Sequence, residues 1–260
     1  MSISVVLNGF RRPAHLQSQI AALHAQSLLP NEIMLWYNNP GDASAAYIDY
    51  GISRDAITAF CSHNLGVWAR FAYALNATSN YVCVLDDDTI PGRRWLENCL
   101  NTMCTHEGML GTVGLEYVNP LPPDQSHYHE PYLRHGWPDG GNNEHVVEVD
   151  FVGHAWFFRR EWLGCMFREP LEPRYRLCGE DIHFSHMLQK YLNVKTYVPP
   201  HPKNDMTLWG STNGFNLGSD DVSLWVSNVE SNGVPFRNLM SEYFNKSRRA
   251  GWKLKNEKQA

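Results

Sequence analysis

The chain has 260 residues, of which 43% are hydrophobic, so it can bury a sizeable core within one α/β unit. Its formal net charge of -5 disfavours a broad nucleic-acid-binding face, which needs a basic surface. Its six cysteines form no C-x-x-C pair, and no apolar run reaches the length of a membrane span. We therefore expect free thiols and a cytoplasmic protein with no signal peptide and no membrane span.

The first half of the chain alternates strand-like and helix-like segments. The expected elements are a strand at 3–7, a helix from Pro13, strands at 32–37 and 56–61, a helix at 67–76, a strand at 81–85 and a helix at 93–104. A strand, a helix and a second strand in this order predict a right-handed parallel crossover. The pattern therefore indicates an α/β fold with a mostly parallel central sheet flanked by helices.

The second half of the chain is less regular. We expect strands at 109–117, 146–158 and 194–198, a helix from Glu180 to about 191 and a further helix near 238–252. The segment 119–144 is rich in Pro, His, Gly, Tyr and Asn and has no clear periodicity. A loop of that length inside a compact domain is usually functional or mobile.

Three adjacent carboxylates, Asp86, Asp87 and Asp88, follow the apolar strand at 81–85 directly. Their mutual repulsion needs an offsetting charge, and Mg²⁺ or Mn²⁺ prefers such oxygen ligands. In open α/β sheets, ligands bind just outside the carboxyl ends of the strands. The motif indicates a metal site, and the alternative is a solvated acidic turn that caps the next helix.

Other polar residues also follow predicted strands and would meet along the same sheet edge. These are Asn8 to Arg12, Asn38 with Asn39, and Asn64 with Arg70. Arginine binds phosphate through its planar fork and asparagine can read a base or ribose edge, so the set suits a nucleoside diphosphate. Phe10 could stack on a base. Taken singly, Phe10 is equally well explained by packing, and each asparagine by a turn.

A second acidic pair, Glu180 and Asp181, begins a predicted helix. A carboxylate there is favoured by the helix dipole, so capping explains the pair as well as a general base does. His183 and His186 lie three residues apart on the same helix without a matching third ligand. We interpret them as part of a polar helix face.

Two further histidines and a tryptophan have open interpretations. His201, in a proline-rich turn after a strand, could complete the coordination of a metal held by Asp88, or it could be structural. Trp156 lies in the run from His154 to Phe158 and belongs either to the core or to a pocket for a sugar acceptor. His154 is assigned to the same acceptor side.

Together these residues resemble the GT-A fold glycosyltransferases. A first strand followed by Asn-x-x-Arg, a second by Trp-x-Asn-Asn and a later one by Asp-Asp-Asp are similar to the pattern of exostosin-like family 64, with family 2 next. Asp86–Asp88 resembles the Asp-x-Asp motif of these enzymes, and Glu180 with Asp181 resembles their later Glu-Asp motif. The resemblance covers residues 3 to 198.

The resemblance implies a role for each matching residue. It implies metal ligation of Mn²⁺ or Mg²⁺ by Asp88, Asp86 and His201. The implied donor-binding residues are Asn8, Phe10, Arg11, Asn38, Asn39, Asn64, Arg70, Asp86 and Asp87. The implied catalytic residues are Asp181 and Glu180, beside the reacting sugar or acceptor.

We therefore expect a metal-dependent glycosyltransferase that moves a hexosyl or N-acetylhexosaminyl group from a UDP-sugar to a hydroxyl. The acceptor would be a glycan, a glycolipid or a modified DNA base, with inverting and retaining courses both open. Alternatives are a nucleotidyltransferase, which normally needs a glycine-rich loop after the first strand, or a glycan- or nucleotide-sugar-binding module without turnover.

The expected domain is 1–202, with a nucleotide-binding half at about 1–92 and an acceptor half at about 93–202. Residues 203–260 would form a C-terminal extension that packs on the same domain, with frayed final residues.

Overall fold

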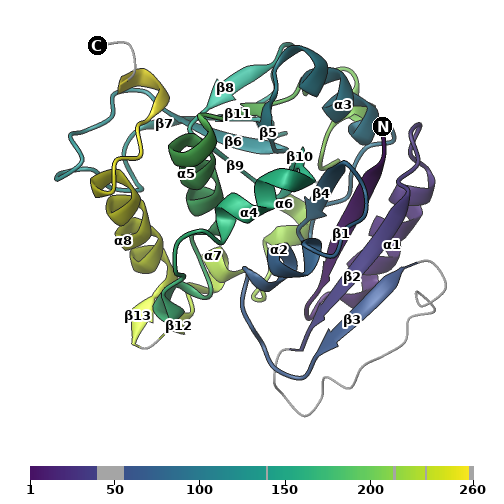
Figure 1. The fold of residues 1–260 in the computed structure, drawn as a ribbon, viewed down its shortest axis with the longest axis horizontal. Coiled ribbons are helices and arrows are strands. Elements are labelled where there is room, and N and C mark those ends of the chain that lie inside the picture. Colours follow the sequence, from purple (N-terminus) through teal and green to yellow (C-terminus); the bar gives the residue numbers. More distant parts are fainter. Residues whose placement is uncertain (40–55, 139, 213–214, 232, 258–260) are drawn as a thin grey trace.

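The structure, a computed structural model, describes residues 1–39, 56–138, 140–212, 215–231 and 233–257. An eight-stranded sheet in the order β3-β2-β1-β4-β10-β5-β11-β8 crosses the molecule (Figure 1). Its strands are β1 (Ile3–Gly9), β2 (Glu32–Asn38), β3 (Ile57–Cys61), β4 (Tyr81–Leu85), β5 (Gly108–Leu110), β8 (Val147–Val149), β10 (Ala155–Arg159) and β11 (Lys195–Val198).

The β3-β2-β1-β4 half of the sheet is parallel, as the sequence predicts. All five residues of β4 are buried, because helices cover a parallel sheet on both faces. Helix α2 (Ala69–Ala74) contacts β1, β2 and β4, and α1 (Pro13–His24) contacts β1. This half therefore brings the carboxyl ends of β1, β2, β3 and β4 to one edge.

The other half of the sheet is mixed, but parallel pairs remain the majority in the eight-stranded sheet, as expected. Strand β10 lies antiparallel between β4 and β5, β11 runs parallel to β5, and β8 runs antiparallel to β11. Periodicity along one segment does not specify the direction of a partner strand far away in the chain.

Two of the predicted strands are wrong in extent, because part of each belongs to a second sheet. It has the order β7-β6-β9, with β6 (Val113–Tyr117), β7 (Tyr132–His135) and β9 (Phe151–Gly153). The predicted strand at 109–117 is therefore two strands in two sheets. The chain bends between them at Gly111, where a Cβ would lie 2.5 Å from the Cβ of Val152. The predicted strand at 146–158 is three strands, and β9 ends before His154, whose φ is 69°.

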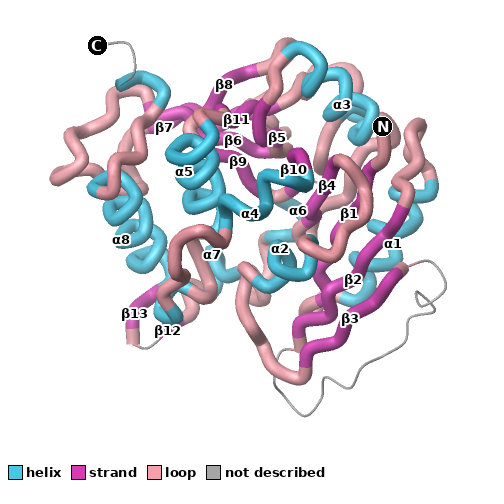
Figure 2. Tube along the Cα trace, viewed as in Figure 1, coloured by secondary structure: helices cyan, strands magenta, loops and turns pink. Residues whose placement is uncertain are grey.

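Helices and loops dominate the chain after β11, as Figure 2 shows. The remaining helices are α3 (Trp95–Thr105), α4 (Leu163–Met166), α5 (Glu180–Leu192), α6 (Phe215–Gly218), α7 (Leu224–Ser227) and α8 (Phe236–Arg249), with 3₁₀ turns at Arg160–Trp162, Pro173–Tyr175, Met206–Leu208 and Lys255–Glu257. A short hairpin, β12 (Glu230–Ser231) and β13 (Val234–Pro235), precedes α8. Helix α8 packs on α5, and its Phe244 lies 4.9 Å from the ring of Tyr117. The division at residue 202 stays a prediction, and residues 258–260, expected to be frayed, fall outside the described residues.

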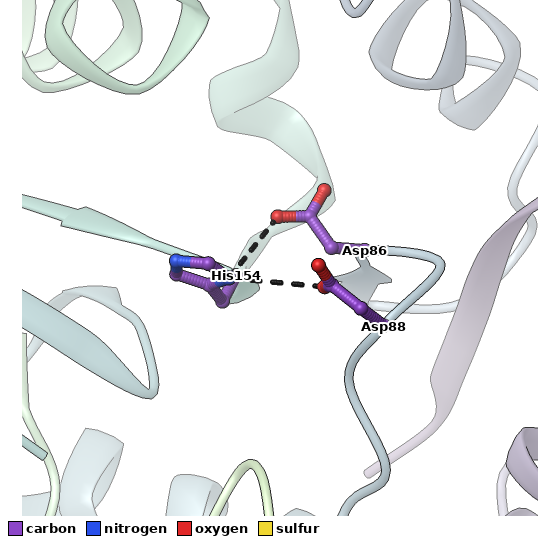
Figure 3. Close-up of side chains that lie close together, drawn as sticks. All are labelled: Asp86, Asp88 and His154. Carbon is purple, nitrogen blue, oxygen red and sulfur yellow. Dashed lines mark ion pairs between the residues drawn. The ribbon is translucent and has the colours of Figure 1, made fainter. Parts of the chain in front are cut away.

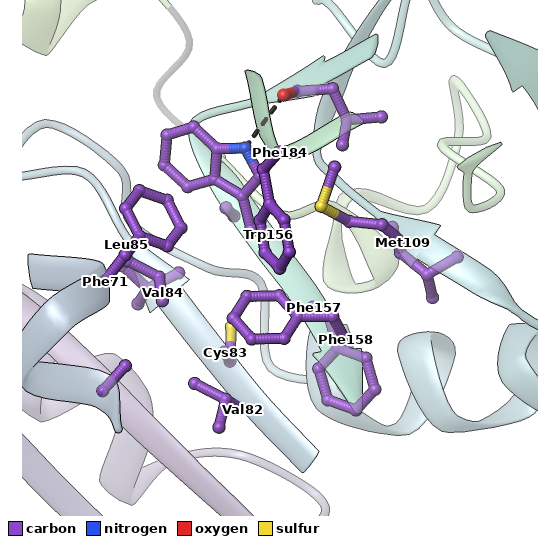
Figure 4. Packing of buried hydrophobic residues seen from close by; sticks show 14 of the residues in the cluster. Phe71, Val82, Cys83, Val84, Leu85, Met109, Trp156, Phe157, Phe158 and Phe184 are labelled. Carbon is purple, nitrogen blue, oxygen red and sulfur yellow. Dashed lines mark hydrogen bonds between the residues drawn. The ribbon is translucent and has the colours of Figure 1, made fainter. Parts of the chain in front are cut away.

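The core is centred on the pairing of β4 with β10 (Figure 4). The rings of Phe158 and Phe184 meet edge to face at 5.0 Å, and Phe71 meets Trp156 at 5.2 Å. Each of these aromatic side chains is at most 2% exposed, and full burial of one contributes about 2–3 kcal/mol. The site edge at the end of β4 therefore rests on a rigid base.

Two histidines of α5 differ from the sequence interpretation. His183 and His186 are buried rather than part of a polar face. His183 donates from Nε2 to the carbonyl oxygen of Met166, and its Nδ1 accepts from the hydroxyl of Tyr243. All six cysteines are free thiols, as expected. Across the described residues, every helix is too short or too polar to cross a bilayer.

Candidate functional site

The acidic turn after β4 is fixed by contacts to its backbone. Gln19 of α1 donates hydrogen bonds to the carbonyl oxygens of Asp86, at 2.6 Å, and Thr89, at 2.9 Å. The Asp86 amide donates to the carbonyl oxygen of His154 at 2.9 Å. These hydrogen bonds occupy backbone groups of the turn, so the carboxylates of the turn remain available for other contacts.

Asp86, Asp88 and His154 form a group that could hold a metal ion (Figure 3). The three ligand atoms lie within 4.8 Å of one another, and the Nδ1 atom of His154 is 3.6 Å from Asp86 and 3.9 Å from Asp88. Strand β10 causes this arrangement, because its antiparallel register places Ala155 opposite Leu85. His154 thereby reaches the end of β4 from a segment 66 to 68 positions later in the chain.

The donor set of this group fits a hard divalent cation. Two carboxylate oxygens and one imidazole nitrogen suit Mn²⁺, and Mg²⁺ takes the same carboxylates with water and phosphate. The side chains of Asp86 and Asp88 are 20% and 17% exposed, which leaves an approach for an ion and a ligand. The chemistry of these ligand atoms therefore fits the expectation that Asp86 and Asp88 bind a metal ion.

Arg12, rather than the expected Arg11, reaches the acidic turn. Its guanidinium lies 2.6 Å from Asp87 and 3.3 Å from Asp88, and it also pairs with Asp220 of the C-terminal segment. The guanidinium of Arg11 lies 5.5 Å from the centre of the Phe10 ring. The left-handed backbone of Arg11, at φ 41°, directs the next side chain instead of its own towards the carboxylates.

Arg70 joins the two acidic motifs. Its guanidinium nitrogen lies 2.9 Å from a carboxylate oxygen of Asp86 and 2.9 Å from one of Glu180. It also lies over the ring of Trp156, 5.0 Å from the ring centre. A buried guanidinium with two carboxylate partners locks the end of β4 to the start of α5.

The acidic residues titrate at different pH values because their partners differ. Burial raises the pKa of Asp87 to about 7 and that of Glu180 to about 8, with Arg12 and Arg70 opposing these shifts. Burial also raises the pKa of Asp181 to about 6, against a hydrogen bond from the Ile182 amide. For Asp88, burial is outweighed by His154 and Arg12, which lower its pKa to about 2.

A polar cavity of about 240 Å³ opens above these groups. Of the expected donor-binding residues, it is lined by Asn8, Phe10, Asn38, Asn64, Arg70, Asp86 and Asp87. Asn38 donates to the Asn64 side chain at 3.0 Å and accepts from the Leu65 amide at 2.9 Å, which fixes both amide groups at the rim. Asn39 and Arg11 are not among its lining residues.

Two expected site residues lie elsewhere. His201 donates from Nδ1 to the carbonyl oxygen of Pro199 at 2.7 Å, and its Nε2 accepts from the Thr112 hydroxyl at 2.9 Å. Both ring nitrogens are therefore engaged in a fully buried turn, and the structure brings His154 instead to the carboxylates. Trp156 is 2% exposed and donates to the carbonyl oxygen of Val152, so it belongs to the core.

An aromatic cavity of about 380 Å³ adjoins the polar cavity. The two share Asp88, His154 and Asp181 as a floor. The rest of its wall comes from β6, β7, β9, the turn after β7, Thr89, Thr112, Tyr128 and described residues between 211 and 240. Of these last residues, Ser223, Trp225, Phe236 and Met240 also line the polar cavity. An atom at the shared floor is thus accessible from two chemically different sides.

The comparisons with known proteins identify the family. A family model described as glycosyl transferase family 2 matches residues 4–167, well over half of the chain. The chain belongs to glycosyl transferase family 2. The sequence resemblance ranked family 64 first and family 2 next. The match spans the metal group and ends before Glu180 and Asp181.

Solved structures are similar to this family 2 chain. S. aureus TarS is similar at a TM-score of 0.52 and 15% identity, with 77% of this chain covering 35% of that chain. A structure of S. aureus TarS 1-349 in complex with UDP-GlcNAc is similar at a TM-score of 0.49 and 15% identity, with 77% of this chain covering 56% of that one. The chain thus spans about a third to somewhat over half of these proteins. The first likeness confirms the predicted GT-A fold class, and no curated protein matches.

The sequence interpretation of the family 2 chain missed three contributions to the site. Arg12 contacts the acidic turn, whereas the sequence interpretation selected its neighbour Arg11. His154 was assigned to the acceptor side alone. The C-terminal segment was given no role, yet Ser223 and Trp225 line both cavities. The Gly153-His154 break in an apolar run was a sequence signal for His154. No local pattern marks the contribution of the C-terminal segment.

Proposed function

We propose that this chain is a metal-dependent glycosyltransferase that moves a sugar from a nucleotide-sugar donor to an acceptor hydroxyl. The observation that carries the proposal is the group of Asp86, Asp88 and His154 at the junction of two cavities that Asp181 also lines. Family membership supports the reaction class.

The polar cavity is proposed to bind the nucleotide, with UDP as the expected nucleotide. Asn38 and Asn64 present fixed amide groups for the base or ribose, and Phe10 offers a ring face beside them. Asn8 lines the same cavity, and Arg12 lies where a diphosphate would meet the acidic turn. When bound to Asp86, Asp88 and His154, Mn²⁺ or Mg²⁺ would supply positive charge for the leaving diphosphate.

Asp181 is proposed as the general base. A pKa of about 6 is close to neutral pH, where a base works best, and the carboxylate reaches the aromatic cavity. It would accept the proton of the acceptor hydroxyl while that oxygen bonds to the anomeric carbon and the bond to the diphosphate breaks. A single displacement of this kind inverts the anomeric configuration. Glu180, held by Arg70, would position this helix start rather than transfer a proton.

The donor site is tested by melting the purified protein with UDP, GDP, CDP and ADP, each with and without Mn²⁺. A ligand at about a hundred times its dissociation constant stabilises the folded state by roughly 2.7 kcal/mol. We expect a metal-dependent shift with UDP that Asp88→Asn abolishes and the exposed control Asp124→Asn retains. Absence of a shift with every nucleotide would refute the donor site.

Turnover separates the remaining alternatives. A glycosyltransferase releases UDP from a UDP-sugar, a nucleotidyltransferase releases pyrophosphate from a nucleoside triphosphate, and a binding module releases neither. We expect UDP release that Asp181→Asn abolishes while UDP binding persists. Pyrophosphate release, or binding without any release, would overturn the proposed activity.

A further inference from the structure

The aromatic cavity has a wall unlike that of the polar cavity. The side chains that line this cavity and not the polar one are mainly aromatic or aliphatic, and they include Val113, Leu115, Tyr128, Tyr132, Trp137 and Phe151. Arg134 is the one charged residue among the described lining residues outside the floor, and it is exposed at the rim. The wall therefore offers ring faces and apolar surface in preference to charge.

The rings form a connected set. Trp225 lies 5.8 Å from Tyr128 and 6.4 Å from Phe236 between ring centres, and Tyr128 lies 6.2 Å from Phe151. At the floor, Trp137 lies 5.6 Å from the ring of His154. Aromatic side chains at such spacings favour a further ring that stacks among them.

The threonine hydroxyls of this cavity are already engaged. Thr89 donates to the carbonyl oxygen of His154 at 3.2 Å, and Thr112 bonds the ring of His201 at 2.9 Å. A pyranose brings several hydroxyl groups that each need a partner after they lose water. A flat unsaturated ring needs far fewer partners and gains from the ring faces.

Tyr128 supplies a polar group in the apolar wall. The residue is 9% exposed, lines the aromatic cavity and not the polar one, and its hydroxyl has no hydrogen-bond partner among the described residues. Tyr128 and Asp181 line the same cavity, and burial together with the negative charge of Asp181 raises the pKa of the Tyr128 hydroxyl. The hydroxyl is not among the fully buried polar atoms without a partner, so it reaches open space in the cavity that Asp181 also lines, where a ligand can bind it.

We propose that the acceptor is an alcohol whose hydroxyl is attached to, or one carbon from, a flat aromatic or heteroaromatic ring. The ring stacks among Tyr128, Trp137 and Trp225, and the hydroxyl lies between Tyr128 and Asp181. Tyr128 is a positioning residue that orients the hydroxyl for proton transfer. This inference rests on the proposed glycosyltransferase function and specifies its acceptor.

Direct binding tests the acceptor class without any need for turnover. Saturation-transfer NMR with UDP and Mg²⁺ present compares benzyl alcohol and 5-hydroxymethyl-2′-deoxyuridine with methyl glucoside. We expect the aromatic alcohols to bind, and Trp137→Ala, at a residue that lines only the aromatic cavity, to weaken their binding about tenfold. Tyr128→Phe keeps the ring and should weaken them several-fold with UDP binding unchanged. The control Phe60→Ala, an exposed ring outside both cavities, should change nothing.

The outcomes separate this inference from the function on which it rests. Absence of binding by both aromatic alcohols, or tighter binding of methyl glucoside, would overturn it even if UDP binds and is released from a UDP-sugar. Absence of UDP binding by the wild-type protein would instead refute the proposed donor site. Product mass then identifies the source of the ring, since transfer to the free nucleoside and transfer to the same base in an oligonucleotide give different products.

Discussion

Replacing Arg70 with methionine removes a cation that lies 2.9 Å from both Asp86 and Glu180 and keeps most of the apolar stem. The side chain of Arg70 is 6% exposed, so water cannot replace it. Removal of one partner from a buried ion pair costs about 3–5 kcal/mol. Because the pKa of Glu180 is about 8, that carboxyl is largely neutral at pH 7 and Asp86 carries most of the penalty.

We therefore expect Arg70→Met to lower the free energy of unfolding by about 3 kcal/mol at pH 7. For a chain of this size, that corresponds to a melting temperature lower by roughly 6–12 °C. Both carboxyls already have raised native pKa values, and loss of Arg70 raises them further. The native variant then binds protons that the unfolded chain lacks, so the difference from wild type should shrink between pH 7 and pH 5.5.

Urea unfolding of Arg70→Met, Glu180→Gln and the double variant measures these effects. The double variant should unfold at nearly the same urea concentration as Arg70→Met alone, because the Glu180 carboxyl is already largely neutral at pH 7 and the penalty falls on Asp86. Arg94→Met serves as the control, since its ion pair with Glu97 is exposed and should contribute little. Equal midpoints for Arg70→Met and wild type, or a difference that does not change with pH, would refute the electrostatic account.

Three further predictions concern stability and metal binding. Desolvation lowers the pKa of the buried His186 side chain from 6.5 to about 4. Between these pH values the unfolded chain binds more protons than the folded chain, so the free energy of unfolding falls as the pH drops through this window. His186→Leu should recover about 2 kcal/mol of the loss between pH 7 and pH 5, as measured by urea unfolding. Gly66→Ala should destabilise the fold by more than about 2 kcal/mol, because the φ of Gly66 is +80° and a Cβ would lie 1.9 Å from the carbonyl oxygen of Arg176. Gly164→Ala in α4 meets open space and should stabilise the fold by about 0.5–1 kcal/mol. Equal melting temperatures for the two variants would contradict this prediction. Arg12→Met should increase the melting shift given by Mg²⁺ alone, because the ion then offsets the two carboxylates that Arg12 contacts, and an unchanged shift would argue against a metal at that turn.

The parallel half of the fold could be predicted because its signals are local. Strand β4 is an apolar run that ends in carboxylates, and α1 begins at Pro13, as expected. The position of β10 could not be predicted, since its antiparallel pairing with β4 depends on contacts between residues at least 70 positions apart. The bend at Gly111 could not be predicted for the same reason, because the side chain of Val152, from another strand, leaves no room for a Cβ there.

The site shows the same division between local and long-range information. Asp86 and Asp88 could be predicted from a motif within one turn. The choice between His154 and His201 depends on which of two polar turns the sheet places beside that motif. The choice between Arg11 and Arg12 depends on a single left-handed backbone conformation, which favours no particular residue type strongly enough to be read from the sequence.

The floor of Asp88, His154 and Asp181 has an evolutionary consequence. The polar cavity draws on the turns that follow β1, β2, β3 and β4, the aromatic cavity draws on β6, β7 and β9, and Ser223, Trp225, Phe236 and Met240 line both. Substitutions or insertions around Tyr132 can therefore reshape one cavity while the turns of the other remain intact. New acceptors can therefore arise on this scaffold by substitution in β6 and β7, while the turns that line the polar cavity stay the same.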